Sequence, residues 1–137
     1  MKFRIVEDYL YPEDFTSPED FTSPEYYNMV NYKFNPDRTL DVFEDVFIST
    51  HNLKELPFKF GKIDGDFYCS YNKLTTLKGA PKIVNGNFYC IGNNLTSLKG
   101  LNFDGISGKI YIKRNPDLKL TEKEELWATL NPGRLIL

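Results

Sequence analysis

One pattern of apolar and polar positions recurs every 21 residues through the middle of the chain. Residues 65–79 return as residues 86–100 with most residue types unchanged. Each copy opens on a short period-two run, which predicts a strand, and then carries Asn followed by Leu two and five positions later. Weaker copies stand before and after this pair, at residues 46–56 and 108–118. A fixed period of this length predicts stacked units that share one continuous core.

Asn with Leu at these spacings is the leucine-rich-repeat pattern, in which every unit contributes one parallel strand. We therefore expect an α+β fold, namely a short leucine-rich-repeat solenoid of about four parallel β-strand coils with an N-terminal hairpin cap and a C-terminal capping helix. The pattern divides the chain into an acidic N-terminal segment (1–31), a β-hairpin cap (32–45), the repeats (46–120), and the C-terminal helix and tail (121–137).

Equivalent positions of neighbouring repeats should stack about 4.8 Å apart, which predicts columns of like residues. The apolar columns are Val46/Phe67/Phe88/Ile110, Ile48/Cys69/Cys90/Ile112, Leu53/Leu74/Leu95 and Leu56/Leu77/Leu98. A polar column, His51/Asn72/Asn93/Asn115, is expected to bond loop backbone groups that no strand satisfies. Cys69 and Cys90 are expected as small buried hydrophobes rather than as a disulfide or a metal site, because zinc needs four ligands. Four glycines, Gly65, Gly79, Gly86 and Gly100, are expected at corners whose backbone angles demand glycine.

The two ends of the chain carry different signals. Residues 32–42 predict strand, turn and strand, a hairpin that covers the open edge of the first repeat. Ser23-Pro24-Glu25 predicts the start of a short helix over residues 24–31. Thr121-Glu122-Lys123-Glu124 predicts a capping-box helix that stops at Asn131-Pro132-Gly133. Its Leu126, Trp127 and Leu130 share one face, and we expect this face to shield the last coil from water.

Two stretches resemble a family of small leucine-rich-repeat proteins from tailed bacteriophages, over residues 32–118. They are Tyr32-Lys33-Phe34-Asn35-Pro36-Asp37, which looks like that family's leading hairpin, and Asn72-Lys73-Leu74-Thr75-Thr76-Leu77-Lys78-Gly79-Ala80-Pro81, which looks like its repeat body. The repeats are also similar to those of bacterial effector proteins, whose ubiquitin ligases add a separate catalytic domain for which 137 residues leave no room. The resemblance implies a phage protein that binds and modulates, by inhibition, a host protein such as a defence or nucleic-acid enzyme.

Charge is distributed unevenly along the chain. Residues 1–45 carry a net charge of -7 and residues 46–137 carry +5, which leaves -2 overall. This balance argues against a general nucleic-acid coat, and no apolar run approaches the ~20 residues that span a bilayer. The chain has two cysteines and one histidine, and it begins without a signal-peptide pattern. We therefore expect a cytoplasmic, non-enzymatic protein with no cofactor, no metal and no membrane association.

An aromatic residue lies between the inward positions of every repeat. Phe47, Tyr68, Tyr89 and Tyr111 predict an aromatic ladder on the exposed face of the sheet. Asp45 and Asp66 flank it toward the first repeat, and Lys109, Lys113 and Arg114 flank it toward the last. This stripe with its charge gradient favours a protein partner held in one orientation. The alternatives are cross-strand stacking on a solvated sheet, with end charges that add solubility, or single-stranded nucleic-acid binding by Tyr89, Tyr111, Lys109, Lys113 and Arg114.

The acidic N-terminal segment contains a tandem hexapeptide, Pro-Glu-Asp-Phe-Thr-Ser, from residue 12 to residue 23. Its carboxylates and aromatic residues are Glu13, Asp14, Phe15, Glu19, Asp20 and Phe21, and Glu25 begins a third, divergent copy. Three interpretations stay open: a linker duplicated by slippage, a recognition motif anchored by the phenylalanines, and mimicry of DNA phosphates directed at a basic host protein. The prolines would hold the segment extended in each case.

Overall fold

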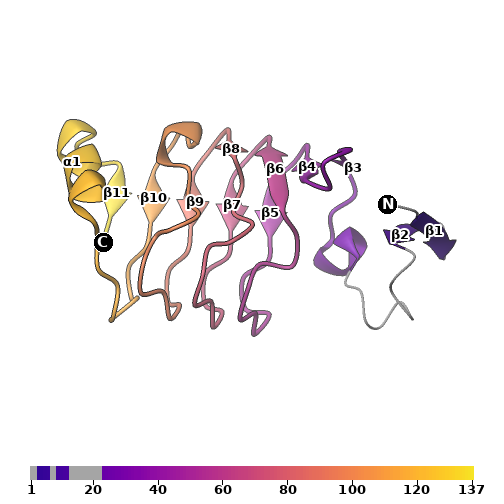
Figure 1. The fold of residues 1–137 in the computed structure, drawn as a ribbon, viewed down its shortest axis with the longest axis horizontal. Helices are drawn as coiled ribbons and strands as arrows, with labels where there is room; N and C mark the ends of the chain where they lie inside the picture. The colour runs from indigo at the N-terminus through magenta and orange to yellow at the C-terminus, as the bar shows by residue number, and fades with distance from the viewer. Residues whose placement is uncertain (1–2, 7–8, 13–22) are drawn as a thin grey trace.

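Parallel strand pairing at a spacing of one repeat organises the part of the chain described in the computed structural model, residues 3–6, 9–12 and 23–137 (Figure 1). A five-stranded parallel sheet has the order β11-β10-β9-β7-β5. Its strands are β5 (Val46–Phe47), β7 (Phe67–Tyr68), β9 (Phe88–Tyr89), β10 (Ile110–Tyr111) and β11 (Leu135–Ile136). The first four come from successive copies of the repeat, so equivalent residues lie opposite one another.

A second sheet, which the pattern did not predict, runs along the other side of the stacked repeats. It has the order β3-β4-β6-β8 and is mixed, because β3 and β4 pair antiparallel while β4, β6 and β8 pair parallel. Its strands are β3 (Tyr32–Phe34), β4 (Leu40–Val42), β6 (Phe60–Ile63) and β8 (Ile83–Val84). The described chain is thus a small α+β domain in which the first two repeats each supply one strand to either sheet.

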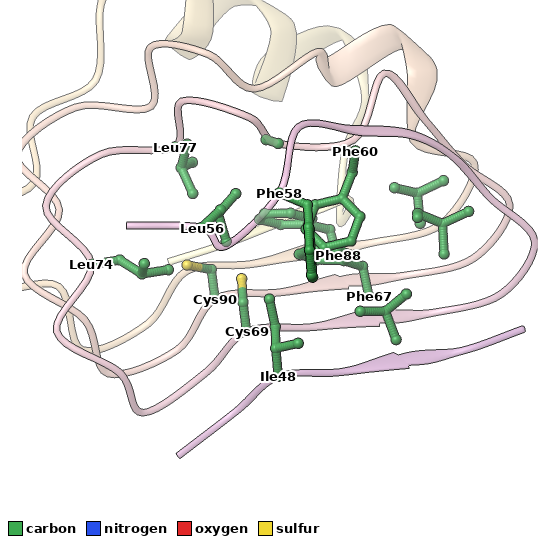
Figure 2. Close-up of a cluster of buried hydrophobic side chains, with 14 of the residues drawn as sticks. Ile48, Leu56, Phe58, Phe60, Phe67, Cys69, Leu74, Leu77, Phe88 and Cys90 are labelled. Atoms are coloured by element: carbon green, nitrogen blue, oxygen red, sulfur yellow. The ribbon is translucent and has the colours of Figure 1, made fainter. Parts of the chain in front are cut away.

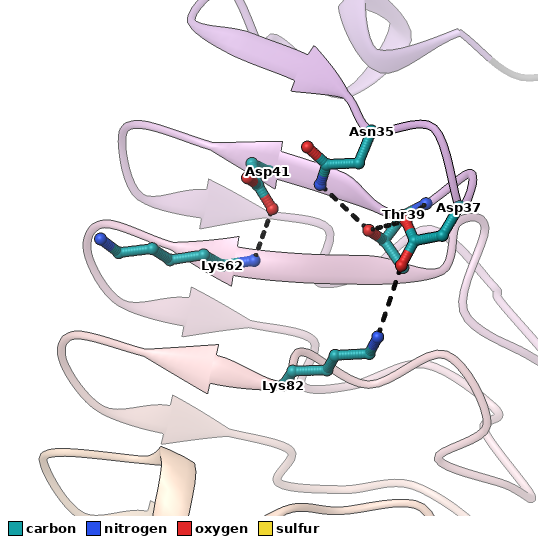
Figure 3. Close-up of polar contacts among 6 residues, drawn as sticks. All are labelled: Asn35, Asp37, Thr39, Asp41, Lys62 and Lys82. Carbon is teal, nitrogen blue, oxygen red and sulfur yellow. Dashed lines mark hydrogen bonds and ion pairs between the residues drawn. The ribbon is translucent and has the colours of Figure 1, made fainter.

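The hairpin predicted over residues 32–42 is present, and it covers the first repeat on the side of the four-stranded sheet. Strand β4 pairs with β6 of the four-stranded sheet, and β5 remains the last strand of the five-stranded sheet. Polar contacts fix this arrangement (Figure 3): the backbone N–H of Lys62 donates to Asp41 at 2.8 Å, and Lys82 reaches Asp37 at 3.6 Å. The hydroxyl and the backbone N–H of Thr39 both donate to the same Asp37 carboxylate. These two bonds, chiefly that of the hydroxyl, lower the pKa of Asp37.

The core lies between the two sheets, and the predicted apolar columns fill it. Phe67 and Phe88 are fully buried with parallel rings 5.5 Å apart, and Phe60 of the second sheet meets Phe67 edge to face (Figure 2). The other column members are buried too, except Leu53, which is partly buried. Period-two alternation therefore predicted the inward residues of the five-stranded sheet correctly.

The described part of the N-terminal segment contains a pair of strands and a 3-10 turn. Strands β1 (Phe3–Val6) and β2 (Tyr9–Pro12) form an antiparallel pair. The helix expected over residues 24–31 is a single 3-10 turn, η2 (Pro24–Tyr27). It ends because Asn28 adopts a left-handed conformation with φ of 62°, after which the chain turns toward β3.

The predicted helix α1 (Glu122–Leu130) follows η3 (Phe103–Gly105) and β10, and its capping box at Thr121 is present. The prediction that its apolar face shields the last coil is wrong for Leu126 and Leu130, which are 58% and 70% exposed, whereas Trp127 packs against the core. Strand β11 extends the sheet beyond β10 instead, and its Leu135 packs against the core. None of the described helices is both long and apolar enough to cross a membrane.

Arg134 bonds the carbonyls of the last repeat that have no following repeat to accept from. In earlier repeats the carbonyls of Val84 and Gly86 accept N–H groups from the following unit. The equivalent carbonyls of Ile106 and Gly108 accept the Arg134 guanidinium. This guanidinium also lies 5.1 Å from the ring centre of Trp127, so the end of the stack and α1 share one anchor.

Candidate binding face

The aromatic ladder predicted from the repeats is present on the side of the five-stranded sheet turned away from the core. Ring centres are 4.9 Å apart for Phe47 and Tyr68, 4.6 Å for Tyr68 and Tyr89, and 4.7 Å for Tyr89 and Tyr111. The rings are within 10° of parallel. The spacing matches that of neighbouring strands, so the sheet register itself stacks the rings. We call these four residues the aromatic face.

Stacking determines which part of each ring a partner can touch. Tyr68 and Tyr89 have an aromatic neighbour on both sides, so both of their faces are covered. Tyr111 lies between Tyr89 and Ile136, its partner on β11. Phe47 is the end ring and is 57% exposed. The aromatic face therefore presents ring edges along most of its length, and edges carry the positive part of the ring quadrupole.

The acidic residues beside the aromatic face hold neighbouring repeats together. Asp45 accepts the backbone N–H of Asp66, and Asp66 accepts the backbone N–H of Asn87, both at 2.7 Å. Asn87 then accepts the backbone N–H of Lys109, also at 2.7 Å. We call Asp45, Asp66 and Asn87 the outer column. Each of its members reaches forward to the next repeat.

Gly65 and Gly86 allow the outer column to reach the next repeat, for a reason other than the predicted one. Of the four glycines predicted from backbone angles, Gly79 and Gly100 do adopt left-handed angles, with φ of 88° and 101°. Gly65 and Gly86 do not, and they are needed because a Cβ there would collide with the outer-column side chain and with backbone of the preceding repeat. The prediction from backbone angles is therefore wrong for these two positions.

The tyrosine hydroxyls are tied to the same column. Tyr68 donates to the second oxygen of Asp66 at 3.1 Å, and Tyr89 accepts from the Asn87 amide at 3.1 Å. The pKa of Tyr68 is raised to about 12, mainly by burial and further by the bond to Asp66. Both oxygens of Asp66 are thus engaged within the fold.

The basic residues beside the last repeat have no comparable role. Lys109, Lys113 and Arg114 are exposed, and none of their side chains forms an ion pair or hydrogen bond with another residue of the described ranges. Lys109 occupies the outer-column position of its repeat, but ammonium cannot accept an N–H. Lys109 also has no N–H to accept, because the next residue in register, Arg134, already donates its backbone N–H to the carbonyl of Asn131.

The predicted polar column is buried inside the loops beside the sheet and reaches backward. Asn93 accepts the N–H of Leu74 at 3.0 Å and donates to the carbonyl of Cys69 at 3.2 Å. Asn72 and Asn115 make the same two kinds of bond to the repeat before them. We call Asn72, Asn93 and Asn115 the inner column.

His51 departs from the inner column, although the pattern aligned it there. It is exposed, its Nδ1 lies 2.6 Å from the carbonyl of Ser49, and its ring is 5.0 Å from that of Tyr27. No repeat precedes the first one, so an amide at this position would have no equivalent backbone to bond. The predicted hydrogen-bonding role survives only as this local contact.

The two cysteines are buried, as predicted, and they are free thiols in the structure. Figure 2 shows their sulfurs side by side, directly after β7 and β9, and the sulfur of Cys69 lies 3.2 Å from the carbonyl oxygen of Tyr89. Burial, followed by the interaction with Cys90, raises the pKa of the Cys69 thiol. In the described ranges, no three His, Cys, Asp or Glu side chains gather into a possible metal site.

Of the predicted site residues in the acidic N-terminal segment, the described ranges include Glu25 alone. Glu25 lies in η2, where its carboxylate accepts the hydroxyl of Tyr32, so the fold holds it rather than displaying it. The other predicted residues of this segment, Glu13, Asp14, Phe15, Glu19, Asp20 and Phe21, lie outside the described ranges.

Sequence reasoning missed the anchoring roles of the outer column and of Arg134. A signal for the first was present, since Asp41, Asp45 and Asp66 are each followed 20 residues later by glycine. Arg134 had no such signal, because it lies outside the repeats. Comparisons of the chain with models of protein families, with curated proteins and with solved structures find no match.

Proposed function

We propose that the chain is a short leucine-rich-repeat solenoid that works as a non-enzymatic protein-interaction module. Support for the solenoid comes from the 21-residue register of the parallel strands and from the inner column, which ties each repeat to the one before. Architectures of stacked repeats commonly present an extended surface to their partners. The resemblance to phage proteins favours a bacterial host protein as the partner, modulated by this binding.

The observation that carries the proposal is the continuous aromatic face. Four aromatic residues on adjacent strands form a rigid stripe that a partner can cover at little cost in side-chain entropy. Stacking on a solvated sheet accounts for the ring contacts themselves. Stacking does not by itself require the cations at one end of the stripe, which form no ion pair in the described ranges.

Binding of single-stranded nucleic acid has less support. Proteins that bind single strands stack bases on open aromatic faces. The rings of Tyr68 and Tyr89 are already covered on both faces by their neighbours. A base would have to separate two rings that the sheet register holds together.

The test is affinity capture from a bacterial lysate with two matched double variants. Tyr68→Thr with Tyr89→Thr removes two rings from the aromatic face and keeps residues that favour strands. Lys62→Thr with Ile83→Thr alters exposed positions of the four-stranded sheet and serves as the control. We expect the first variant to lose the captured protein and the control to keep it. Equal capture by both folded variants would refute the proposal.

A further inference from the structure

The two ends of the aromatic face differ in how far their charged side chains are already bonded within the fold. At the first-repeat end, one oxygen of Asp45 accepts the N–H of Asp66. Both oxygens of Asp66 accept bonds, from the N–H of Asn87 and the hydroxyl of Tyr68. These acids keep their charge, but donors of the fold occupy their oxygens. The gradient predicted from the sequence is therefore lopsided in the bonding groups that remain for a partner.

The cations at the last-repeat end have no such bonds within the described ranges. Lys109, Tyr111 and Lys113 alternate along one strand and its extension, so their side chains leave the same side of the sheet. Arg114 follows directly with a left-handed φ of 59°, where the chain turns away from the sheet. Three exposed cations thus border one tyrosine, with no ion pair among the residues of the described ranges.

Ring edges add to this preference. The exposed parts of Tyr89 and Tyr111 are edges and hydroxyl-bearing rims, because stacking covers their faces. Edges favour carbonyl and carboxylate oxygens over cations. The cations and the ring edges therefore select the same kind of group.

We propose that this end of the aromatic face, formed by Tyr89, Lys109, Tyr111, Lys113 and Arg114, binds a carboxylate-rich segment of a partner protein. The inference rests on the proposed function and adds the chemistry of the partner. Carboxylates of the segment pair with the ammonium groups and with the Arg114 guanidinium, which can hold one in a two-bond geometry. Its backbone carbonyls and apolar groups lie over the tyrosine edges. An acidic protein segment fits better than a nucleic acid, because Tyr89 and Tyr111 at this end have a neighbour on each side and leave no open ring for a base to stack on.

The test uses the full chain and three fluorescein-labelled peptides in fluorescence anisotropy. The peptides are three copies of Glu-Gly-Tyr-Glu, of Gln-Gly-Tyr-Gln and of Lys-Gly-Tyr-Lys. We expect the Glu peptide to bind about tenfold more tightly than the Gln peptide and the Lys peptide to bind most weakly, with the preference fading as salt rises. Failure of the Glu peptide to bind at about 1 mM would overturn the inference.

Charge variants locate the effect. Lys113→Glu with Arg114→Glu should weaken binding of the Glu peptide about tenfold and strengthen binding of the Lys peptide. Lys78→Glu with Lys99→Glu makes the same change in net charge at exposed turn positions after β7 and β9, away from the aromatic face. It should change affinity by less than about threefold. If the first variant does not fold, Lys109→Gln with Lys113→Gln removes two cations with less perturbation. Equal effects at both places would contradict the proposal.

The remaining outcomes separate this inference from the proposed function. If the Glu and Gln peptides bind equally and the Tyr68→Thr/Tyr89→Thr variant binds neither, the face binds protein but the acidic preference is wrong. If all three peptides bind alike and the tyrosine variant changes nothing, the proposed function fails as well. If a labelled twelve-nucleotide oligothymidylate binds more tightly than the Glu peptide, the ligand is a nucleic acid and the inference is overturned.

Discussion

Two polar columns run along the five-stranded sheet, and they bond in opposite directions. The inner column reaches back to the preceding repeat, as Asn93 does to Leu74, while the outer column reaches forward, as Asp66 does to Asn87. Each column breaks at the end where nothing is left to bond. The inner one gives way to His51 in the first repeat, and the outer one gives way to Lys109 in the last. A departure from a repeat pattern can therefore mark the end of a structural role.

The columns also differ in burial, which should set how much each contributes to stability. Inner-column side chains are at most 8% exposed, and their bonds satisfy backbone groups inside the molecule. Outer-column bonds lie at the surface, where water can replace a lost side chain. Removal of a buried partner leaves the other group unsatisfied, at a cost of about 1–3 kcal/mol for each group.

The largest effect is expected from Asn93→Ala. It leaves the buried N–H of Leu74 without its side-chain acceptor and removes one of the two amides that donate to the carbonyl of Cys69. We expect a loss of about 3 kcal/mol in the free energy of unfolding, measured with urea. Asn94→Ala, at the exposed neighbouring position, should change stability by less than about 0.5 kcal/mol. Similar losses for both variants would contradict a buried anchoring role.

The next largest effect is expected from Gly86→Ala. Its Cβ would lie 2.7 Å from the carbonyl oxygen of Gly65 and would also collide with the carboxylate of Asp66. We expect a loss of about 2 kcal/mol that Asp66→Ala does not relieve, because the backbone contact remains. At Gly61 the nearest groups are all side chains, so Asp41→Ser should relieve part of the cost of Gly61→Ala. Double-mutant cycles measure both couplings, and equal rescue at the two positions would show that backbone approach is not the cause.

A smaller effect is expected from Asp66→Ala, at about 1 kcal/mol, because the two lost bonds lie near the surface. Asp66→Asn keeps an oxygen that accepts the N–H of Asn87, as Asn87 itself does for the next repeat. It should therefore stay within about 0.5 kcal/mol of the parent chain. If Asn destabilises as much as Ala, the carboxylate charge rather than the hydrogen bond holds the repeats.

The smallest effect concerns alkaline pH. Because the pKa of Tyr68 is raised from 10.0 to about 12, the folded state keeps this proton longer than the unfolded state does. Its contribution to stability is present below pH 10 and is lost as the pH rises from about 10 to 12. Ultraviolet titration of the native protein should show one late-ionising tyrosine that disappears in Tyr68→Phe. A Tyr68→Phe titration identical in shape to the parent curve would contradict the raised pKa of Tyr68.

The sequence predicted the columns of the five-stranded sheet because a repeat forces equivalent residues to stack. Phe67 and Phe88 point inward while Tyr68 and Tyr89 point outward, as simple alternation requires. The same reasoning predicted the ladder of rings, since the parallel register sets both its existence and its spacing.

The remaining elements depend on contacts that alternation cannot encode. Strand β8 contributes only two residues and has one of them, Ile83, exposed, so it carries no period-two signal. Strand β11 lies outside the repeats, and it ends the stack with the help of the Arg134 guanidinium. Alternation does not show that the acids of the outer column are bonded, because their partners are backbone N–H groups of the next repeat.

The two sides of β9 provide the most direct test of the central claim, that the repeat turns one aromatic residue inward and its neighbour outward. Phe88 is fully buried, and the adjacent Tyr89 lies on the aromatic face. Urea unfolding of Phe88→Ala and Tyr89→Ala compares them in one experiment. We expect Phe88→Ala to lose about 3–5 kcal/mol and Tyr89→Ala to lose less than about 1.5 kcal/mol. Equal losses, or a larger loss for Tyr89→Ala, would contradict the account.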